Sequence, residues 1–227
     1  MAELDKPCPD EELALFAGRS LVKAPEGFWA DEESLARLRV LQHKAAEQGI
    51  ELAVCSAFRS FERQYQIFKD KYEGRRPVLD AEEKTVDISA LSPAEKIKAI
   101  TYFSALPGLS RHHLGTDFDV YAKNLLPKGQ KLQLTYHEYA PGAYFEPLGR
   151  FLSAEAEACG FVRPFMQSSW RGGPEPWHLS YHRRAQILLS AFNFASFAAL
   201  YAHKTDDFVP AVLSYGWAHF KDLLCLG

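Results

Sequence analysis

The sequence predicts an α+β fold, in which helices and short strands follow one another without the strand–helix–strand alternation of a parallel sheet. Residues 31–48 and 61–72 carry apolar side chains at helical spacing, and residues 50–56 and 118–121 are short apolar runs typical of strands. Hydrophobic residues make up 47% of the 227 residues, which is enough for a core that needs no disulfide framework.

The first expected elements lie between residues 31 and 89. A helix is predicted over residues 31–48, where leucines and alanines recur at helical spacing, and a strand over residues 50–56 (IELAVCS). Residues 61–72 predict a second helix. Residues 74–89 have mixed charge, a proline and no clear period, so we expect a loop.

A third helix is expected from Ser92 to about residue 105. Ser92 can cap its N-terminus, Pro93 suits the first turn, and Glu95 can complete a capping box. The Pro107–Gly108 pair that follows predicts its end.

The second half of the chain predicts a strand at residues 118–121 and a helix over residues 144–159 that Gly160 ends. The sequence after His178 is expected to be helical. Residues 185–202 are uncharged, but they contain polar side chains, so a buried or amphipathic helix is favoured over a transmembrane one.

Charge and cysteine content exclude several classes of function. Lys and Arg number 26 against 29 Asp and Glu, so nothing indicates the basic surface of a nucleic-acid-binding protein. The four cysteines form no C-x-x-C pair, and Cys55 and Cys159 are expected to be buried free thiols. Cys8 and Cys225 lie near the termini, where they can pair or stay free.

Three clusters contain residues that can bind a metal ion or take part in catalysis. They are Ser56-Ala-Phe-Arg59-Ser60-Phe-Glu-Arg-Gln64, Ser110-Arg-His112-His113-Leu-Gly115-Thr-Asp117-Phe-Asp119 and Glu175-Pro-Trp177-His178. A catalytic zinc ion takes three ligands from His, Asp or Glu and leaves a fourth position for water. The second and third clusters together hold enough such residues for one site.

His112 and Asp119 can bind the same metal ion only if the chain turns between them. His112 and Asp119 can converge if Gly115 allows a turn and Asp119 points inward from a strand, with His178 as the third ligand. His113 competes with His112 for this role, and Asp117 competes with Asp119. Each residue taken alone is more often a hydrogen-bonding residue than a ligand.

These motifs resemble those of the zinc D-alanyl-D-alanine carboxypeptidases of the VanY type, which are related to D-Ala-D-Ala dipeptidases and L,D-carboxypeptidases. The pattern S-x-H-x-x-G-x-A-x-D is met by Ser110, His112, Gly115 and Asp119, and E-x-W-H by Glu175, Trp177 and His178. The pattern S-x-[YF]-R-S-x-x-x-Q is met by Ser56, Phe58, Arg59, Ser60 and Gln64. Asp117 stands where the family usually has Ala, which suggests a carboxylate that orients a ligand.

The resemblance implies a single domain with a small antiparallel sheet flanked by helices, as in the Hedgehog and DD-peptidase fold. We expect an N-terminal segment over residues 1–30, the zinc peptidase domain over residues 31–182, and a helical extension packed on it over residues 183–227. The aromatic side chains of that extension are expected to add to the core, with a dimer or membrane contact as the alternative.

The resemblance also implies one zinc ion per chain, held by His112, Asp119 and His178. It assigns Glu175 as the acid/base that activates water and Arg59 as the group that stabilises the developing negative charge. Ser110, Gln64, Trp177 and Ser56 are expected to contact the substrate, and Asp117 to support the ligands.

The implied reaction is hydrolysis of the terminal D-Ala-D-Ala bond of a peptidoglycan stem peptide by a monomer. L,D-carboxypeptidase, D,D-dipeptidase or endolysin-type endopeptidase activity is the alternative, followed by a non-catalytic zinc module that recognises peptides and by a metal-free structural domain. The substrate implies the cell envelope or periplasm. Residues 1–10 show no signal peptide, so a cytoplasmic location stays open.

Overall fold

The computed structural model describes residues 20–166, 174–190 and 192–224. The chain divides into two compact units, each built from segments that are far apart in the sequence. The first unit comprises residues 1–58, 114–167 and 174–191, and the second comprises residues 59–113, 168–173 and 192–227. The predicted domain bounds stay a prediction.

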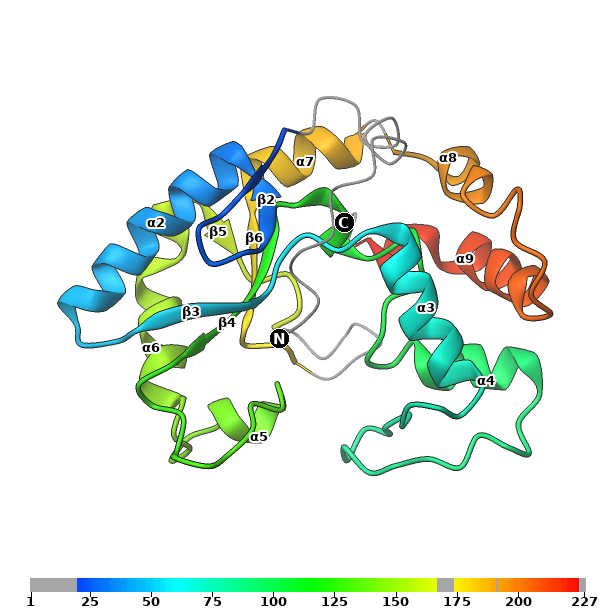
Figure 1. The fold of residues 1–227 in the computed structure, drawn as a ribbon, viewed down its shortest axis with the longest axis horizontal. Helices are drawn as coiled ribbons and strands as arrows, with labels where there is room; N and C mark the ends of the chain where they lie inside the picture. The colour runs from blue at the N-terminus through cyan, green and yellow to red at the C-terminus, as the bar shows by residue number, and fades with distance from the viewer. Residues whose placement is uncertain (1–19, 167–173, 191, 225–227) are drawn as a thin grey trace. The chain divides into compact units, whose positions relative to one another are not determined.

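A four-stranded antiparallel sheet forms the centre of the first unit (Figure 1). Its strands lie in the order β3-β4-β6-β5, with β3 at Leu52–Ser56, β4 at Asp117–Ala122, β6 at His178–Tyr181 and β5 at Phe161–Val162. A separate antiparallel pair joins β1 (Leu21–Lys23) to β2 (Trp29–Asp31). This arrangement of helices and small antiparallel sheets confirms the predicted α+β class.

Two helices pack their apolar sides against one face of this sheet (Figure 1). They are α2 (Glu32–Glu47) and α6 (Glu146–Glu155). The single-turn helix η2 (Glu157–Cys159) follows α6, and Gly160 ends it with the expected left-handed conformation, at φ +87°. The described residues of this unit also form α5 (Tyr136–Tyr139) and α7 (His182–Ser190).

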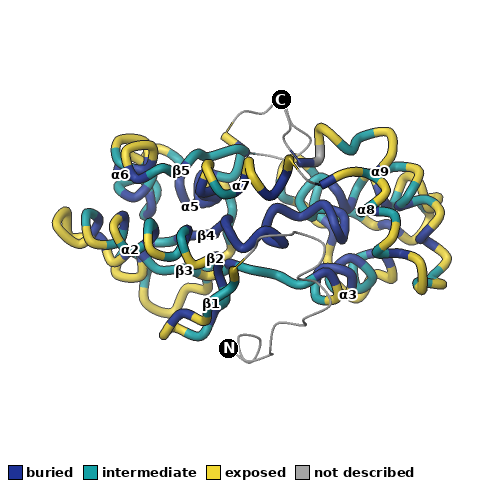
Figure 2. The backbone as a smooth tube through the Cα atoms, turned by 90° about the horizontal axis from the view of Figure 1, so that it is seen from above, coloured by how far each residue is buried: buried dark blue, intermediate teal, exposed yellow. Residues whose placement is uncertain are grey.

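Side-chain alternation divides the two central strands into an apolar and a polar face. Phe118 and Val120 of β4 and Leu179 of β6 belong to the hydrophobic core, together with residues of α2 and α6. Asp117 and Asp119 therefore point to the opposite face. Figure 2 shows β4 as a buried strand (dark blue) and the outer turns of α2 as exposed (yellow).

The second unit is helical. It contains α3 (Phe61–Tyr72), α4 (Pro93–Ile100), α8 (Phe194–Ala199) and α9 (Val209–Leu223). The single-turn helix η1 (Arg111–Leu114) lies where the chain passes from this unit to the first. Ser92 and Glu95 form the capping box that the sequence predicts for α4.

Aromatic side chains from both ends of this unit's sequence make its core. Tyr65 and Phe68 of α3 contact Phe208, with ring centroids 5.4 and 5.9 Å apart, and Tyr201 packs on Phe61 at 5.4 Å. The aromatic C-terminal segment therefore contributes to a core, as the sequence predicts.

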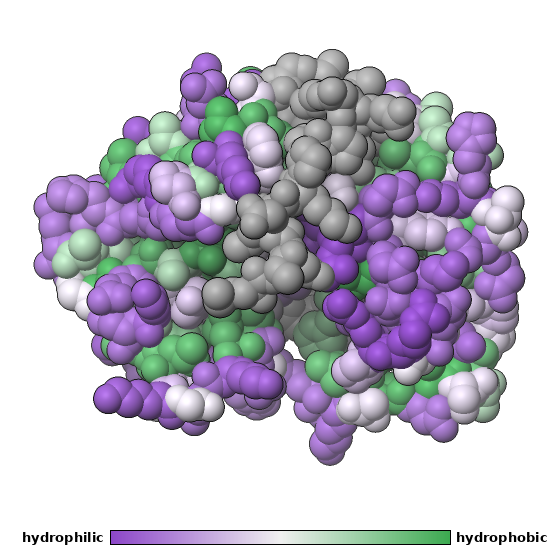
Figure 3. All heavy atoms as spheres, viewed as in Figure 1, coloured by the Kyte–Doolittle hydropathy of each residue, from purple (hydrophilic) through white to green (hydrophobic). Residues whose placement is uncertain are grey.

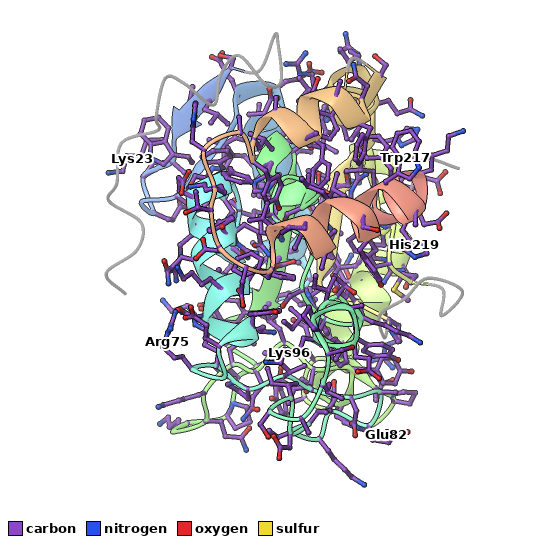
Figure 4. All side chains as sticks on the ribbon, turned by 90° about the vertical axis from the view of Figure 1, so that its right-hand side faces the viewer. Lys23, Arg75, Glu82, Lys96, Trp217 and His219 are labelled. Atoms are coloured by element: carbon purple, nitrogen blue, oxygen red, sulfur yellow. The ribbon has the colours of Figure 1, made fainter. Side chains whose placement is uncertain are left out.

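The outer surface of the same segment carries one large exposed aromatic residue, Trp217 of α9, which is labelled in Figure 4. Its side chain is 69% exposed, and its ring contacts Phe194 at 4.7 Å. Hydrophilic side chains make up most of the coloured surface in Figure 3. Among the described residues, no helix has the length and apolar character needed to cross a bilayer.

Several elements differ from their sequence-based predictions. His178 begins the strand β6, and the helical segment starts only at His182, because residues 178–181 pair with β4 and β5. The third helix ends at Ile100 instead of about residue 105. The helix predicted over residues 144–159 consists of α6 and the separate turn η2.

One of the two cysteines expected to be buried is exposed. Cys159 is buried, but Cys55 is exposed because it lies at a register shift between Val54 and Ser56 in the edge strand β3. Cys8 and Cys225 lie outside the described residues.

Candidate metal centre

Strands β4 and β6 bring together two of the three predicted ligands. Asp119 is paired with His178 in the antiparallel register, and Asp117 is paired with Ser180. Directly opposed residues of neighbouring strands place their side chains on the same face, about 5 Å apart at Cβ. The polar face of the sheet therefore carries these four side chains together.

The imidazole of His178 lies between the two carboxylates of β4. Its Nδ1 is 3.0 Å from Asp119 Oδ1, and its Nε2 is 2.9 Å from Asp117 Oδ1. All three side chains are buried, with residue exposures of 2%, 6% and 0% for His178, Asp119 and Asp117. Each ring nitrogen thus has a different carboxylate as its neighbour.

His112 completes the candidate site from η1. One ligand atom each from His112, Asp119 and His178 lie within 4.8 Å of one another, and all three residues are buried. The turn between η1 and β4 depends on Gly115, whose φ is +77°, a conformation that glycine adopts without strain. The expected turn at Gly115 is confirmed.

The structure distinguishes His112 from its neighbour. The His113 ring accepts a hydrogen bond at Nε2 from the Gly108 amide, at 3.0 Å, and its Nδ1 is 2.6 Å from the Arg59 carbonyl oxygen. A backbone donor and a backbone acceptor therefore engage both nitrogens of His113. This histidine holds the backbone around η1, and His112 is the one in the candidate metal group.

Asp117 is held by hydroxyl groups on the side away from His178. Its Oδ2 accepts hydrogen bonds from Thr116 Oγ1 at 2.6 Å and from Ser180 Oγ at 3.1 Å. These contacts leave Oδ1 directed at His178 Nε2. A carboxylate in this position fixes the ring orientation of a ligand histidine and leaves the other nitrogen to the metal.

The charges at this site favour a cation. Burial alone lowers the pKa of His178, but its hydrogen bonds with Asp117 and Asp119 outweigh that effect and raise the pKa to about 10. Two buried carboxylates so close together require compensating positive charge, which a metal cation or a protonated imidazole can supply. The His, Asp and His donors have the chemistry of a catalytic zinc site.

Glu175 lies beside the group without belonging to it. Its carboxylate Oε2 is 3.6 Å from His178 Nδ1, and its side chain is 24% exposed. The Glu175 backbone is fixed at both ends, because its amide donates to the Phe165 carbonyl and its carbonyl accepts from the His178 amide. A partly exposed carboxylate is thus held next to the buried ligands.

Arg59 is positioned by contacts within the second unit. Its Nη1 donates to Gln64 Oε1 at 2.8 Å, and its backbone amide donates to the His112 carbonyl at 3.1 Å. Gln64 is buried, and its Nε2 donates to the Ala105 carbonyl at 2.7 Å. Gln64 therefore orients Arg59, while its predicted contact with substrate stays a prediction.

The other predicted substrate-binding residues have varied environments. Ser56 ends β3 opposite Asp119 and is partly buried, and Ser110 is buried directly before η1. Trp177 is buried in the core, where its ring lies 5.5 Å from that of Tyr139. Its predicted place in the wall of the site stays a prediction.

Three neighbours of the site did not emerge from the sequence analysis. Thr116 and Ser180 hold Asp117, and the Phe165 ring lies 4.7 Å from the His178 ring in an edge-to-face arrangement. The alternation of His178 and Ser180 along a strand was the available signal for Ser180, but it depends on recognising β6.

Buried Asp and His side chains from a small antiparallel sheet, a buried His from the adjoining turn η1 and a more accessible glutamate have the donor set of a metal-dependent hydrolase. The family is given by sequence comparison. Residues 29–184 match the model of VanY, D-alanyl-D-alanine carboxypeptidase, so the chain belongs to the VanY family.

Two curated relatives, both uncharacterized proteins of Haemophilus influenzae, match parts of the chain. One is 44% identical over 86 residues, which cover 37% of this chain and 66% of the relative. The other is 38% identical over 74 residues, which cover 33% of this chain and 51% of the relative. The chain thus spans about two thirds and one half of these relatives.

Two solved structures share the fold at low sequence identity. One is a mutant of the vancomycin resistance D,D-pentapeptidase VanY from a VanB-type resistance cassette in complex with Zn(II). It is 19% identical, with a TM-score of 0.52 over 79% of this chain and 89% of that chain. The other, VanYB in complex with D-alanine-D-alanine, is 19% identical with a TM-score of 0.52 over 82% and 90%.

Proposed function

We propose that this protein is a zinc-dependent carboxypeptidase that hydrolyses the terminal D-Ala-D-Ala bond of peptidoglycan stem peptides. One observation carries the proposal: the buried His112, Asp119 and His178 group, with ligand atoms within 4.8 Å, has the Glu175 carboxylate beside it. Membership of the VanY family supports the reaction class. The Zn(II) and D-alanine-D-alanine bound by the two structural relatives support the metal and the substrate.

His112, Asp119 and His178 would hold one zinc ion, with His178 using the Nδ1 that faces Asp119. When bound, zinc lowers the pKa of a water molecule toward neutrality and polarises the scissile carbonyl. Asp117 accepts the Nε2 proton of His178 in a hydrogen bond, so that the imidazole stays in one tautomer and one orientation.

Glu175 is the proposed acid/base. Its carboxylate is close to the ligands and partly exposed, so it can take a proton from the attacking water and return it to the leaving amine. Arg59 is proposed to stabilise the negative charge that develops on the carbonyl oxygen, because its guanidinium stays charged and presents a planar set of donors. Gln64 holds that guanidinium in place.

The free carboxylate of the substrate needs its own donors. Ser110, Arg59 and Gln64 are the proposed donors. Ser56 and Trp177 are proposed to shape the region around the leaving residue. We also propose that the protein acts as a monomer and that its substrate places it in the cell envelope, with a cytoplasmic role on peptidoglycan precursors as the alternative.

The test combines metal content with product release. The expected result is one zinc per chain by mass spectrometry and release of D-alanine from a stem pentapeptide, which a chelator abolishes and added zinc restores. Tetrapeptides, free D-Ala-D-Ala and cross-linked wall, assayed in parallel, separate this activity from L,D-carboxypeptidase, dipeptidase and endopeptidase activities. No zinc under metal-replete conditions would refute the proposal.

Two variants separate metal binding from catalysis. Glu175→Ala should keep zinc and lose more than about 99% of the hydrolysis rate, because removal of an acid/base group costs about 10²–10⁴-fold. His178→Ala should lose zinc and activity together. Glu51→Ala removes an exposed carboxylate of the same unit and serves as the control that should keep both.

A further inference from the structure

The first unit contains a cleft of about 500 Å³ whose lining includes none of the proposed metal ligands or catalytic residues. Helices α5 and α6, which are labelled in Figure 1, contribute residues to its lining. Aromatic and apolar side chains line it together with charged ones, among them Tyr136, Tyr139, Met166, Pro176, Arg150, Arg163 and the Glu146 carboxylate. A cleft of this size suits a ligand of several residues.

Two lining residues of the cleft directly follow, in the chain, residues around the candidate metal centre. Pro176 directly follows Glu175 in the chain, and Tyr139 packs against Trp177, with ring centroids 5.5 Å apart. Met166 follows Phe165, whose ring lies against His178. All of these residues belong to the first unit, so the cleft and the strand that bears His178 share one framework.

Arg163 provides a positive charge in this cleft. Within the described residues, the recorded partner of its guanidinium is the Ser153 hydroxyl, with Nη2 and Oγ 2.8 Å apart, and no carboxylate lies at ion-pair distance. Burial lowers the pKa of Arg163, which indicates that the guanidinium has lost part of its hydration. Arg150, in contrast, is paired with Glu146 at 3.0 Å.

A partly hydrated guanidinium that is paired with a hydroxyl retains donors for an anion. Arginine binds a carboxylate through two parallel hydrogen bonds, and such charge-assisted bonds are stronger than neutral ones. Tyr136 and Tyr139 add apolar walls beside it. This combination fits a peptide segment that carries a carboxylate better than it fits a neutral or basic one.

The reaction indicates which part of the substrate occupies the cleft. A carboxypeptidase releases a single terminal residue, so the leaving side of its substrate is small. A several-residue cleft that includes Pro176, the residue after Glu175, therefore suits the longer part of the peptide, on the amino side of the scissile bond.

We propose that this cleft binds the upstream part of the peptide and that Arg163 recognises a free carboxylate there, which makes it a specificity-determining residue. The inference rests on the proposed function for its substrate class. In a stem peptide, the matching group is the α-carboxylate of the γ-linked D-glutamate.

The experiment compares two peptides that differ only in that group. The first is L-Ala-γ-D-Glu-L-Lys-D-Ala-D-Ala, and the second carries an amide in place of the D-Glu α-carboxylate. The zinc-loaded full chain should show a KM about tenfold lower for the acidic peptide, with kcat within about twofold. Arg163→Ala should raise the KM for the acidic peptide about tenfold and leave that of the amidated peptide unchanged.

Two further variants separate recognition from a structural role. Arg163→Lys keeps the charge and should recover part of the preference. Arg183→Ala removes an exposed arginine of the same unit, which pairs with Glu33, and should keep the preference intact. Equal KM changes for both peptides in Arg163→Ala, or the same result for Arg163→Ala and Arg183→Ala, would overturn the inference.

Direct binding keeps this test independent of turnover. Calorimetry with the tetrapeptide L-Ala-γ-D-Glu-L-Lys-D-Ala should give a Kd about tenfold weaker for Arg163→Ala than for the wild type. If the wild type releases no D-alanine from either pentapeptide, the proposed function fails. The tetrapeptide Kd then decides the inference alone, and equal Kd values for the two proteins would overturn it.

Discussion

Gly115 should be the most sensitive backbone position near the candidate metal centre. A Cβ atom at this residue would lie 2.5 Å from Leu21 Cδ2 and 3.1 Å from the Asp31 backbone nitrogen. That nitrogen also donates to the Gly115 carbonyl at 2.8 Å, so the close approach is part of a hydrogen-bonded backbone contact. Gly115→Ala therefore introduces both a steric conflict and backbone strain at φ +77°.

The expected cost follows from these two effects. A non-glycine residue in the left-handed region costs about 1–2 kcal/mol, and overpacking of a tight site costs about 1–3 kcal/mol. Gly115→Ala should thus lower the free energy of unfolding by about 2–5 kcal/mol. It should also weaken zinc binding, because the turn sets the distance between His112 and Asp119.

Gly129→Ala is the matched control. Gly129 has a φ of +82°, but no atom lies within 4 Å of the position its Cβ would take, so only the backbone strain applies. Urea denaturation of both variants measures the difference, and zinc content measures the effect on the site. Equal destabilisation by the two substitutions would refute the steric argument.

The remaining predictions concern Asp117 and Lys71. Asp117→Asn should weaken zinc affinity about 10–100-fold while the fold is kept, because the negative charge of Asp117 that orients His178 through Nε2 is lost. Metal competition with a chromogenic chelator measures the zinc affinity. An unchanged affinity would show that Asp117 does not support the ligand. Burial, together with the charges of Arg76 and Arg59, lowers the pKa of Lys71 from 10.5 to about 8. The folded state therefore holds this proton less tightly than the unfolded state, and the cost is full below about pH 8 and disappears as the pH rises to about 10.5. Lys71→Met should raise the free energy of unfolding at pH 7 by about 2 kcal/mol, after allowance for the lost Lys71–Ser104 hydrogen bond. Above pH 10.5 only the lost hydrogen bond remains, so the variant should be less stable than the wild type by about 1 kcal/mol. A gain that is independent of pH would contradict this assignment.

Local signals in the sequence predicted much of the fold. The helix at residues 61–72 has the same bounds in the structure, because Ser60 caps it and its apolar residues repeat regularly. The capping box at Ser92 and the stop at Gly160 are likewise encoded by adjacent residues. Such features need no information from the rest of the chain.

Features that depend on pairing between distant segments were harder to predict. The strand β6 has only four residues, and its conformation results from hydrogen bonds to β4 and β5. The exposure of Cys55 depends on a register shift against β4, although its neighbours in sequence are apolar. Contacts between β3 and β4 are not visible in the sequence of either strand alone.

The candidate site also combines residues that sequence motifs predict with contacts that only the folded chain reveals. The resemblance to the VanY family implied His112, Asp119, His178 and Glu175, which the structure brings close together. The spacing of the residues alone left His113 as a competitor of His112, and the hydrogen bonds of His113 to the backbone give the physical reason for the choice. The place of Arg163 in the cleft was not predicted, because it depends on the packing of α5 and α6.

Because side chains alternate along β4, the same strand register places residues in both the candidate site and the core. Asp117 and Asp119 face the site, and Phe118 and Val120 face the core. A single-residue insertion or deletion within this strand would exchange the two sets, turning carboxylates into the core and aromatic and aliphatic groups toward the candidate metal centre. In evolution, the length of β4 should therefore be fixed by two independent selective pressures, whereas length changes should accumulate in loops such as residues 74–89.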